Sequence, residues 1–94
     1  MTRDLIETFL RTMSEAIDRA RAGLASGAAE QVTAAAHSCF GSSATLGLNS
    51  LSPTLRALEQ AARNRRVPEI RRLISDWERE FQRVKEMLVA RKQP

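Results

Sequence analysis

The chain contains one histidine, His37, and its position favours chemistry at the surface over packing in the interior. A helix through this segment turns by about 100° per residue, which places Val32, Ala36 and Cys39 on one apolar stripe. His37 points away from that stripe, so we expect its imidazole to face solvent. A neutral imidazole is a nucleophile near pH 7, because one ring nitrogen carries the proton and the other keeps a lone pair. A surface histidine without a role is the alternative interpretation.

The residues near His37 on the same side of this helix leave room for a partner molecule. Ala34 and Gly41 lie one turn away and Ala44 two turns on, and all three are small. In a helix interior, glycine costs about 1 kcal/mol relative to alanine. We therefore expect something to approach the backbone closely at Gly41.

Length and cysteine content narrow the class of protein. The 94 residues are expected to form one domain, 1–94, and no apolar run approaches the roughly 20 residues that span a bilayer. We expect no secretory signal, because no charged stretch followed by an apolar one opens the sequence. Cys39 is the only cysteine, so the chain has neither an internal disulfide nor a zinc site of the usual kind. We expect a cytoplasmic monomer that does not insert into membranes and holds no metal.

The formal net charge of +4 suits nucleic acid, a membrane surface or an acidic protein partner. A nucleic-acid binder is supported only by this charge and by the arginine clusters within 63–66 and 71–72. Most charges are expected on polar helix faces with opposite charges nearby. A solvated surface explains them more simply, so we expect no nucleic-acid partner.

Four segments carry apolar residues at spacings of three and four, which predicts four amphipathic helices. They are expected at about 5–26, 28–46, 53–63 and 68–90. We expect Gly27 to cap the start of the second helix and Gly47 to end it. The short connections predict an all-α fold, an antiparallel up-down-up-down four-helix bundle. Phe9, Trp77 and Phe81 are expected in its core.

From His37 to Gly47 the sequence reads H-S-C-F-G-S-S-A-T-L-G, which resembles the H-x-x-K-G-S-S-x-x-L-G pattern of histidine phosphotransfer (Hpt) domains. The segments 9–10, 58–62 and 77–88 also look like that family, so the resemblance covers nearly the whole chain. It implies a four-helix bundle of a two-component phosphorelay. His37 would accept a phosphoryl group from the aspartate of one receiver domain and pass it to another. Such a domain is a phosphocarrier and not an autonomous kinase, and this chain has no Gly-rich phosphate loop.

The same resemblance suggests roles for the residues around His37. Glu59, which follows it by 22 positions, would accept the Nδ1–H and leave Nε2 free to attack. Otherwise Glu59 is an ordinary surface carboxylate paired with Arg56 or Arg63. Phe40 stands where the family usually has a lysine that adds positive charge beside the phosphoryl group. Either arginine, being within one turn of Glu59, could supply that charge instead.

The implied partners are receiver domains of response regulators or of hybrid sensor histidine kinases. The divalent metal needed for transfer is expected on the receiver, so no cofactor is expected on this chain. Phe40 supports a second hypothesis, an Hpt-like docking or inhibitory module that binds a receiver without being phosphorylated. Phe40 would then enlarge an apolar docking surface. Ser42 and Ser43 are expected to bond a helix carbonyl or to pack against the third helix, not to contact phosphate.

Overall fold

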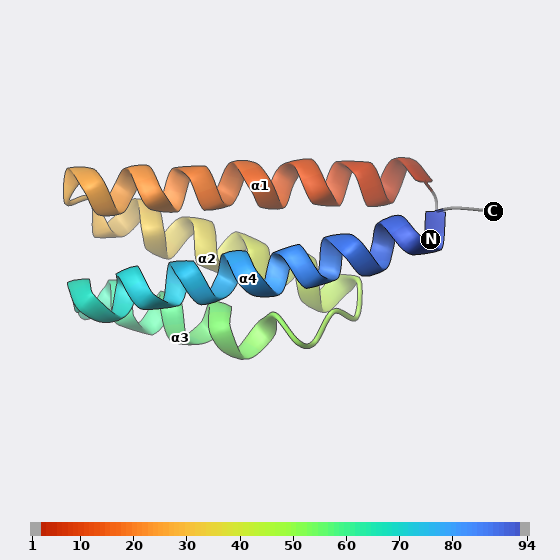
Figure 1. Cartoon of the computed structure of the whole chain (residues 1–94). Coiled ribbons are helices and arrows are strands. Elements are labelled where there is room, and N and C mark those ends of the chain that lie inside the picture. The colour runs from red at the N-terminus through yellow and green to blue at the C-terminus, as the bar shows by residue number, and fades with distance from the viewer. Residues whose placement is uncertain (1–2, 93–94) are drawn as a thin grey trace.

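A computed structural model of the protein describes residues 3–92, which form four helices and no strand (Figure 1). The helices are α1 (Arg3–Ser26), α2 (Ala29–Thr45), α3 (Ser52–Arg63) and α4 (Val67–Lys92). They run alternately in opposite directions, so the start of α1 and the end of α4 lie at the same end of the bundle (Figure 1). The predicted all-α antiparallel bundle is confirmed.

Each helix packs against two of the others. α2 lies beside α1 and α3, and α4 lies beside α1 and α3, whereas within the described residues the backbones of the diagonal pairs do not come close to each other. This arrangement is that of an up-down-up-down bundle. Because α2 and α3 are antiparallel neighbours, a residue that follows His37 on α2 lies beside a residue that precedes Glu59 on α3.

The four helices enclose one apolar core, and it contains the three aromatic residues predicted for it. Trp77 is fully buried, and its indole Nε1–H donates to the sulfur of Met13 at 3.1 Å. This contact ties α4 to α1 and satisfies the one polar group of the indole. Leu51, which directly precedes α3, and the regularly spaced apolar residues of α3 and α4 are buried: Leu51, Leu55, Leu58, Ala62, Ile70, Leu73, Ile74, Trp77, Phe81, Val84 and Leu88.

Leu5 departs from the expected apolar face. Its spacing matches the inward residues of the first helix, yet it is 45% exposed. Leu5 instead borders an open cavity of about 230 Å³ between α1 and the end of α2, with Thr45 and Leu46 among the other lining residues. Its side chain therefore faces this cavity and is not enclosed by the core.

Glycines end both helices of the first hairpin. Gly27 has a φ of +76°, its N–H donates to Leu24 O at 3.3 Å, and the N–H of Ala28 donates to Gly23 O at 2.8 Å. These two bonds form a Schellman ending for α1. The prediction that Gly27 caps α2 is therefore wrong, since Ala28 precedes that helix without a side-chain cap. Gly47, with a φ of +72°, ends α2 as predicted.

Candidate functional site

His37 lies at the middle of α2 with its side chain 72% exposed. On the opposite face of the same helix, Val32, Ala36 and Cys39 are buried in the core. The predicted outward orientation of the imidazole is confirmed. The position of His37 on the polar face of α2 is therefore enough to expose the ring to solvent.

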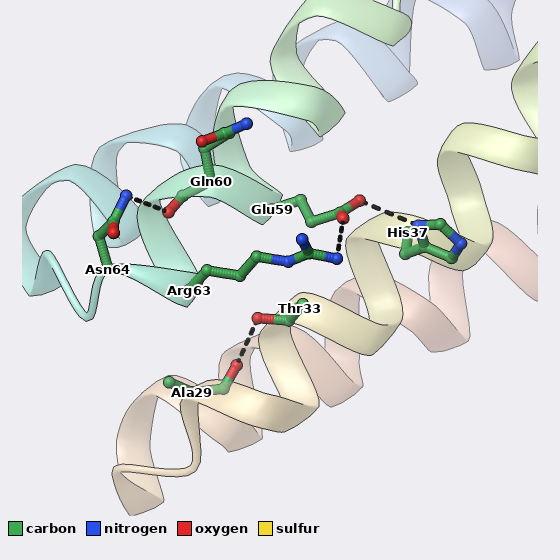
Figure 2. A network of polar contacts seen from close by, with 7 residues as sticks. All are labelled: Ala29, Thr33, His37, Glu59, Gln60, Arg63 and Asn64. Carbon is green, nitrogen blue, oxygen red and sulfur yellow. Dashed lines mark hydrogen bonds and ion pairs between the residues drawn. The ribbon is translucent and has the colours of Figure 1, made fainter.

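Glu59 of α3 binds the imidazole from one side (Figure 2). Its Oε1 lies 3.1 Å from Nδ1 of His37. An ionised carboxylate only accepts hydrogen bonds, so in the neutral imidazole Nδ1 carries the hydrogen and Nε2 keeps the lone pair. Figure 2 shows Nε2 on the side of the ring away from Glu59. The site thus offers one nucleophilic nitrogen, with the proton held on the other.

The Glu59 carboxylate is itself held in place. Its side chain is only 17% exposed, and its second oxygen, Oε2, lies 2.7 Å from Nη2 of Arg63 (Figure 2). Glu59 therefore contacts both His37 and Arg63, because these two residues use different oxygens of its carboxylate. The ion pair with Arg63 aims Oε1 at the imidazole.

Arg56 occupies a different part of the site. Its guanidinium carbon lies 5.5 Å from the centre of the Phe40 ring, a cation–π contact between α3 and α2. Phe40 is half-buried and packs against the core. A cavity of about 250 Å³ brings most of the predicted site residues together; its lining is His37, Phe40, Arg56, Glu59, Gln60 and Arg63.

Gln60 is the one lining residue that the sequence analysis did not single out. It follows Glu59 directly and lies one turn after Arg56 on α3. Its position on the same helix face is the signal that could have found it. Side chains at such spacings are neighbours on a helix surface.

Gly41 and Ala44 do not line this cavity, although both are exposed on α2. A Cβ atom built on Gly41 would meet no atom within 4 Å. Internal packing therefore does not require a glycine here. Contact with a partner at these two positions stays a prediction.

Ser42 and Ser43 interact with the helical bundle itself. The Ser42 hydroxyl lies 3.3 Å from the carbonyl oxygen of Ser38, to which it donates within α2. Ser43 is fully buried, and neither serine lines the His37 cavity. The hydrogen bond of Ser42 to a helix carbonyl is one of the structural roles expected for these serines, and the absence of phosphate contact stays a prediction.

The arginines near the end of α3 are neutralised by carboxylates. Besides the pair at Glu59, Arg65 lies 2.7 Å from Glu30, and Arg66 lies 3.7 Å from Glu69. A backbone hydrogen bond at the start of α2 and the bond from Arg65 lower the pKa of Glu30 below its usual value. This pairing favours a solvated surface over a nucleic-acid interface.

Metal binding and membrane insertion are two further classes on which the described residues bear. Among residues 3–92, no group of three or more His, Cys, Asp and Glu side chains is arranged to hold a metal ion. Over the same range, no helix has the length and apolar character needed to cross a membrane. The metal expected on a receiver partner is not tested by either result.

Cys39 provides a chemical test of the α2 register. Burial raises the pKa of its thiol to about 11, against the opposing attraction of the Arg19 guanidinium. The thiolate, which is the reactive form, is then scarce below that pH, at about one part in 1,000 at pH 8. We expect iodoacetamide to alkylate the native protein at pH 8 at least about 100-fold more slowly than the urea-unfolded protein. Equal rates would place Cys39 at the surface and contradict the register that exposes His37.

Comparison with known proteins agrees with the geometry. The family model described as Hpt domain matches residues 4–88, a range that includes both His37 and Glu59. No curated protein and no solved structure matches the chain. Hpt domains are phosphocarriers of two-component signalling that interact with receiver domains. The family match and the four-helix bundle lead to one conclusion: the chain belongs to the Hpt domain family.

Proposed function

We propose that this chain relays a phosphoryl group between receiver-domain aspartates through His37. One observation carries the proposal: an exposed imidazole whose Nδ1 is bound to Glu59 at 3.1 Å while Nε2 faces away from that carboxylate. The partners are the receiver domains of response regulators or of hybrid sensor kinases. In this proposal the protein acts in the cytoplasm as a monomer, without nucleic acid.

The transfer is a substitution at phosphorus. The lone pair of Nε2 forms a P–N bond, the P–O bond of the aspartyl phosphate breaks, and the aspartate carboxylate leaves with the electron pair. Nδ1 keeps its proton, so the phosphorylated ring is positively charged and is stabilised by the Glu59 carboxylate. The reverse step passes the group to a second receiver. We assign the divalent ion that neutralises the phosphoryl oxygens to the receiver.

The test is phosphate incorporation from a phosphorylated receiver domain. We expect acid-labile, base-stable label on the wild type and none on His37→Ala. Because His37 is the only histidine, any phosphohistidine is assigned without mapping. Ser38→Ala, which removes the adjacent exposed hydroxyl, should retain the label. Label on His37→Ala, or no label on the wild type with several competent receivers, would overturn the proposal.

A docking or inhibitory module is the second candidate, and the Phe40 side chain favours it. The ring lines the cavity at His37 and stands where the family usually has a lysine. If docking alone is the function, His37→Ala should preserve both receiver binding and biological output. A carrier should instead lose its output while receiver binding stays largely intact.

A further inference from the structure

Two arginines line the His37 cavity, and they differ in their partners. Arg63 is paired with Glu59 at 2.7 Å. Arg56 makes no ion pair with any carboxylate of the described residues, and its contact is the face of the Phe40 ring. Among the described residues that line this cavity, Arg56 is thus the cation that no carboxylate neutralises.

The two arginines also lie on different sides of His37. Arg63 borders a second cavity with Thr33 and Ala34, which come before His37 on α2. Arg56 lies beside Phe40, which comes after His37, as the antiparallel packing of α2 and α3 requires. In Figure 2, Nε2 lies on the side of the imidazole away from both Glu59 and Arg63. A group attached to Nε2 therefore extends away from Arg63.

A phosphoryl group on Nε2 would need positive charge beside it. It adds nearly two negative charges, and the cavity already contains the Glu59 carboxylate. A guanidinium can supply this positive charge, and its planar fork of N–H donors matches the geometry of phosphate oxygens. Within the described residues no carboxylate pairs with the Arg56 guanidinium, which lies over the Phe40 ring, so its N–H donors are not engaged in an ion pair.

Building on the relay function, we propose that Arg56, positioned by the Phe40 ring, binds the phosphoryl oxygens on phosphorylated His37. The aromatic contact keeps the guanidinium at the cavity while the histidine is unphosphorylated. No covalent bond changes in this step, since Arg56 only forms hydrogen bonds and an ion pair with a group already transferred. Arg56, held in place by Phe40, then supplies the positive charge that a single basic residue after His37 would otherwise provide.

The test uses phosphoramidate, a small donor that needs no receiver. Its phosphoryl group passes to Nε2 and ammonia leaves. At fixed donor and ammonia concentrations, the ³¹P NMR signal of the phosphorylated protein and the known total protein concentration give the ratio of phosphorylated to free protein. We expect Arg56→Ala to lower that ratio about tenfold, the lower end for a charge-assisted hydrogen bond. Arg56→Lys keeps the positive charge but loses the planar fork of N–H donors, so its ratio should fall between those of the wild type and Arg56→Ala. Arg72→Ala removes an equal charge from an exposed position on α4, whose backbone does not come close to α2, and should match the wild type.

Variants of Phe40 separate the role of the ring from that of the charge. Phe40→Leu keeps apolar volume without a π face and should lower the ratio about threefold. Phe40→Lys places a cation one turn after His37, so adding Arg56→Ala to it should have little further effect. In the wild type, the Arg56 Nε–H resonance should shift when His37 is phosphorylated.

The outcomes distinguish the two proposals. Wild-type phosphorylation with an unchanged ratio in Arg56→Ala and an unmoved Arg56 resonance would overturn the assignment of Arg56 and leave the relay function standing. Failure of the wild type to accept phosphate from both phosphoramidate and phosphorylated receivers would overturn the relay function, and the Arg56 assignment with it.

Discussion

Replacing Glu59 with alanine should slow phosphoryl transfer to His37 about 100-fold, the lower end of what a positioned proton-binding group contributes. The substitution removes the acceptor that lies 3.1 Å from Nδ1. The proton is then free to occupy either ring nitrogen, and the ring is free to rotate, so Nε2 is less often an aligned nucleophile. The phosphorylated ring also loses the anion that stabilises its positive charge. Single-turnover transfer from a phosphorylated receiver domain measures the effect.

Two further variants separate orientation from charge. Glu59→Gln keeps an acceptor oxygen without the negative charge, so we expect a loss of only about tenfold, the factor set by about 1.4 kcal/mol. Glu86→Ala removes an exposed carboxylate from α4 and should transfer at the wild-type rate. A wild-type rate in Glu59→Ala would contradict the orienting role and leave Glu59 as the ion-pair partner of Arg63.

The bundle was predictable because its periodicity persists over long segments. From Ile70 to Leu88, apolar residues recur at spacings of three and four over several turns, and the structure buries them on one face of α4. Helix ends depend on more local physics. Gly27 fits either the end of one helix or the start of the next, and only its φ of +76° and its carbonyl partner, Leu24, decide between them.

The candidate site was predictable in its parts but not in its contacts. The outward direction of His37 follows from helix geometry, and the choice of Glu59 came from the resemblance to Hpt domains. The sequence could not separate Arg56 from Arg63, because both lie within one turn of Glu59. Their different partners depend on the antiparallel packing of α2 and α3 and on side-chain rotamers, which one-dimensional spacing does not contain.

Replacing Gly41 with leucine should slow transfer from a receiver domain at least 100-fold, or about 3 kcal/mol of activation free energy. A Cβ at this position meets no atom within 4 Å, so the side chain would extend outward without disturbing the bundle. It would stand between the imidazole and an approaching receiver. Phosphoramidate is small enough to pass it, and phosphorylation by that donor should fall less than about threefold, a change of under 1 kcal/mol.

Gly41→Ala should separate stability from transfer. It should raise the free energy of unfolding in urea by about 0.5 to 1 kcal/mol, because it removes a flexible residue from a helix interior without steric conflict. The same methyl group should slow transfer from a receiver domain but not from phosphoramidate. Ala22→Leu adds bulk to an exposed position on α1 and should transfer normally. If Gly41→Leu accepts phosphate from a receiver domain at the wild-type rate, no partner approaches the backbone at this position. Close docking would then not explain why an open helix face carries a destabilising glycine.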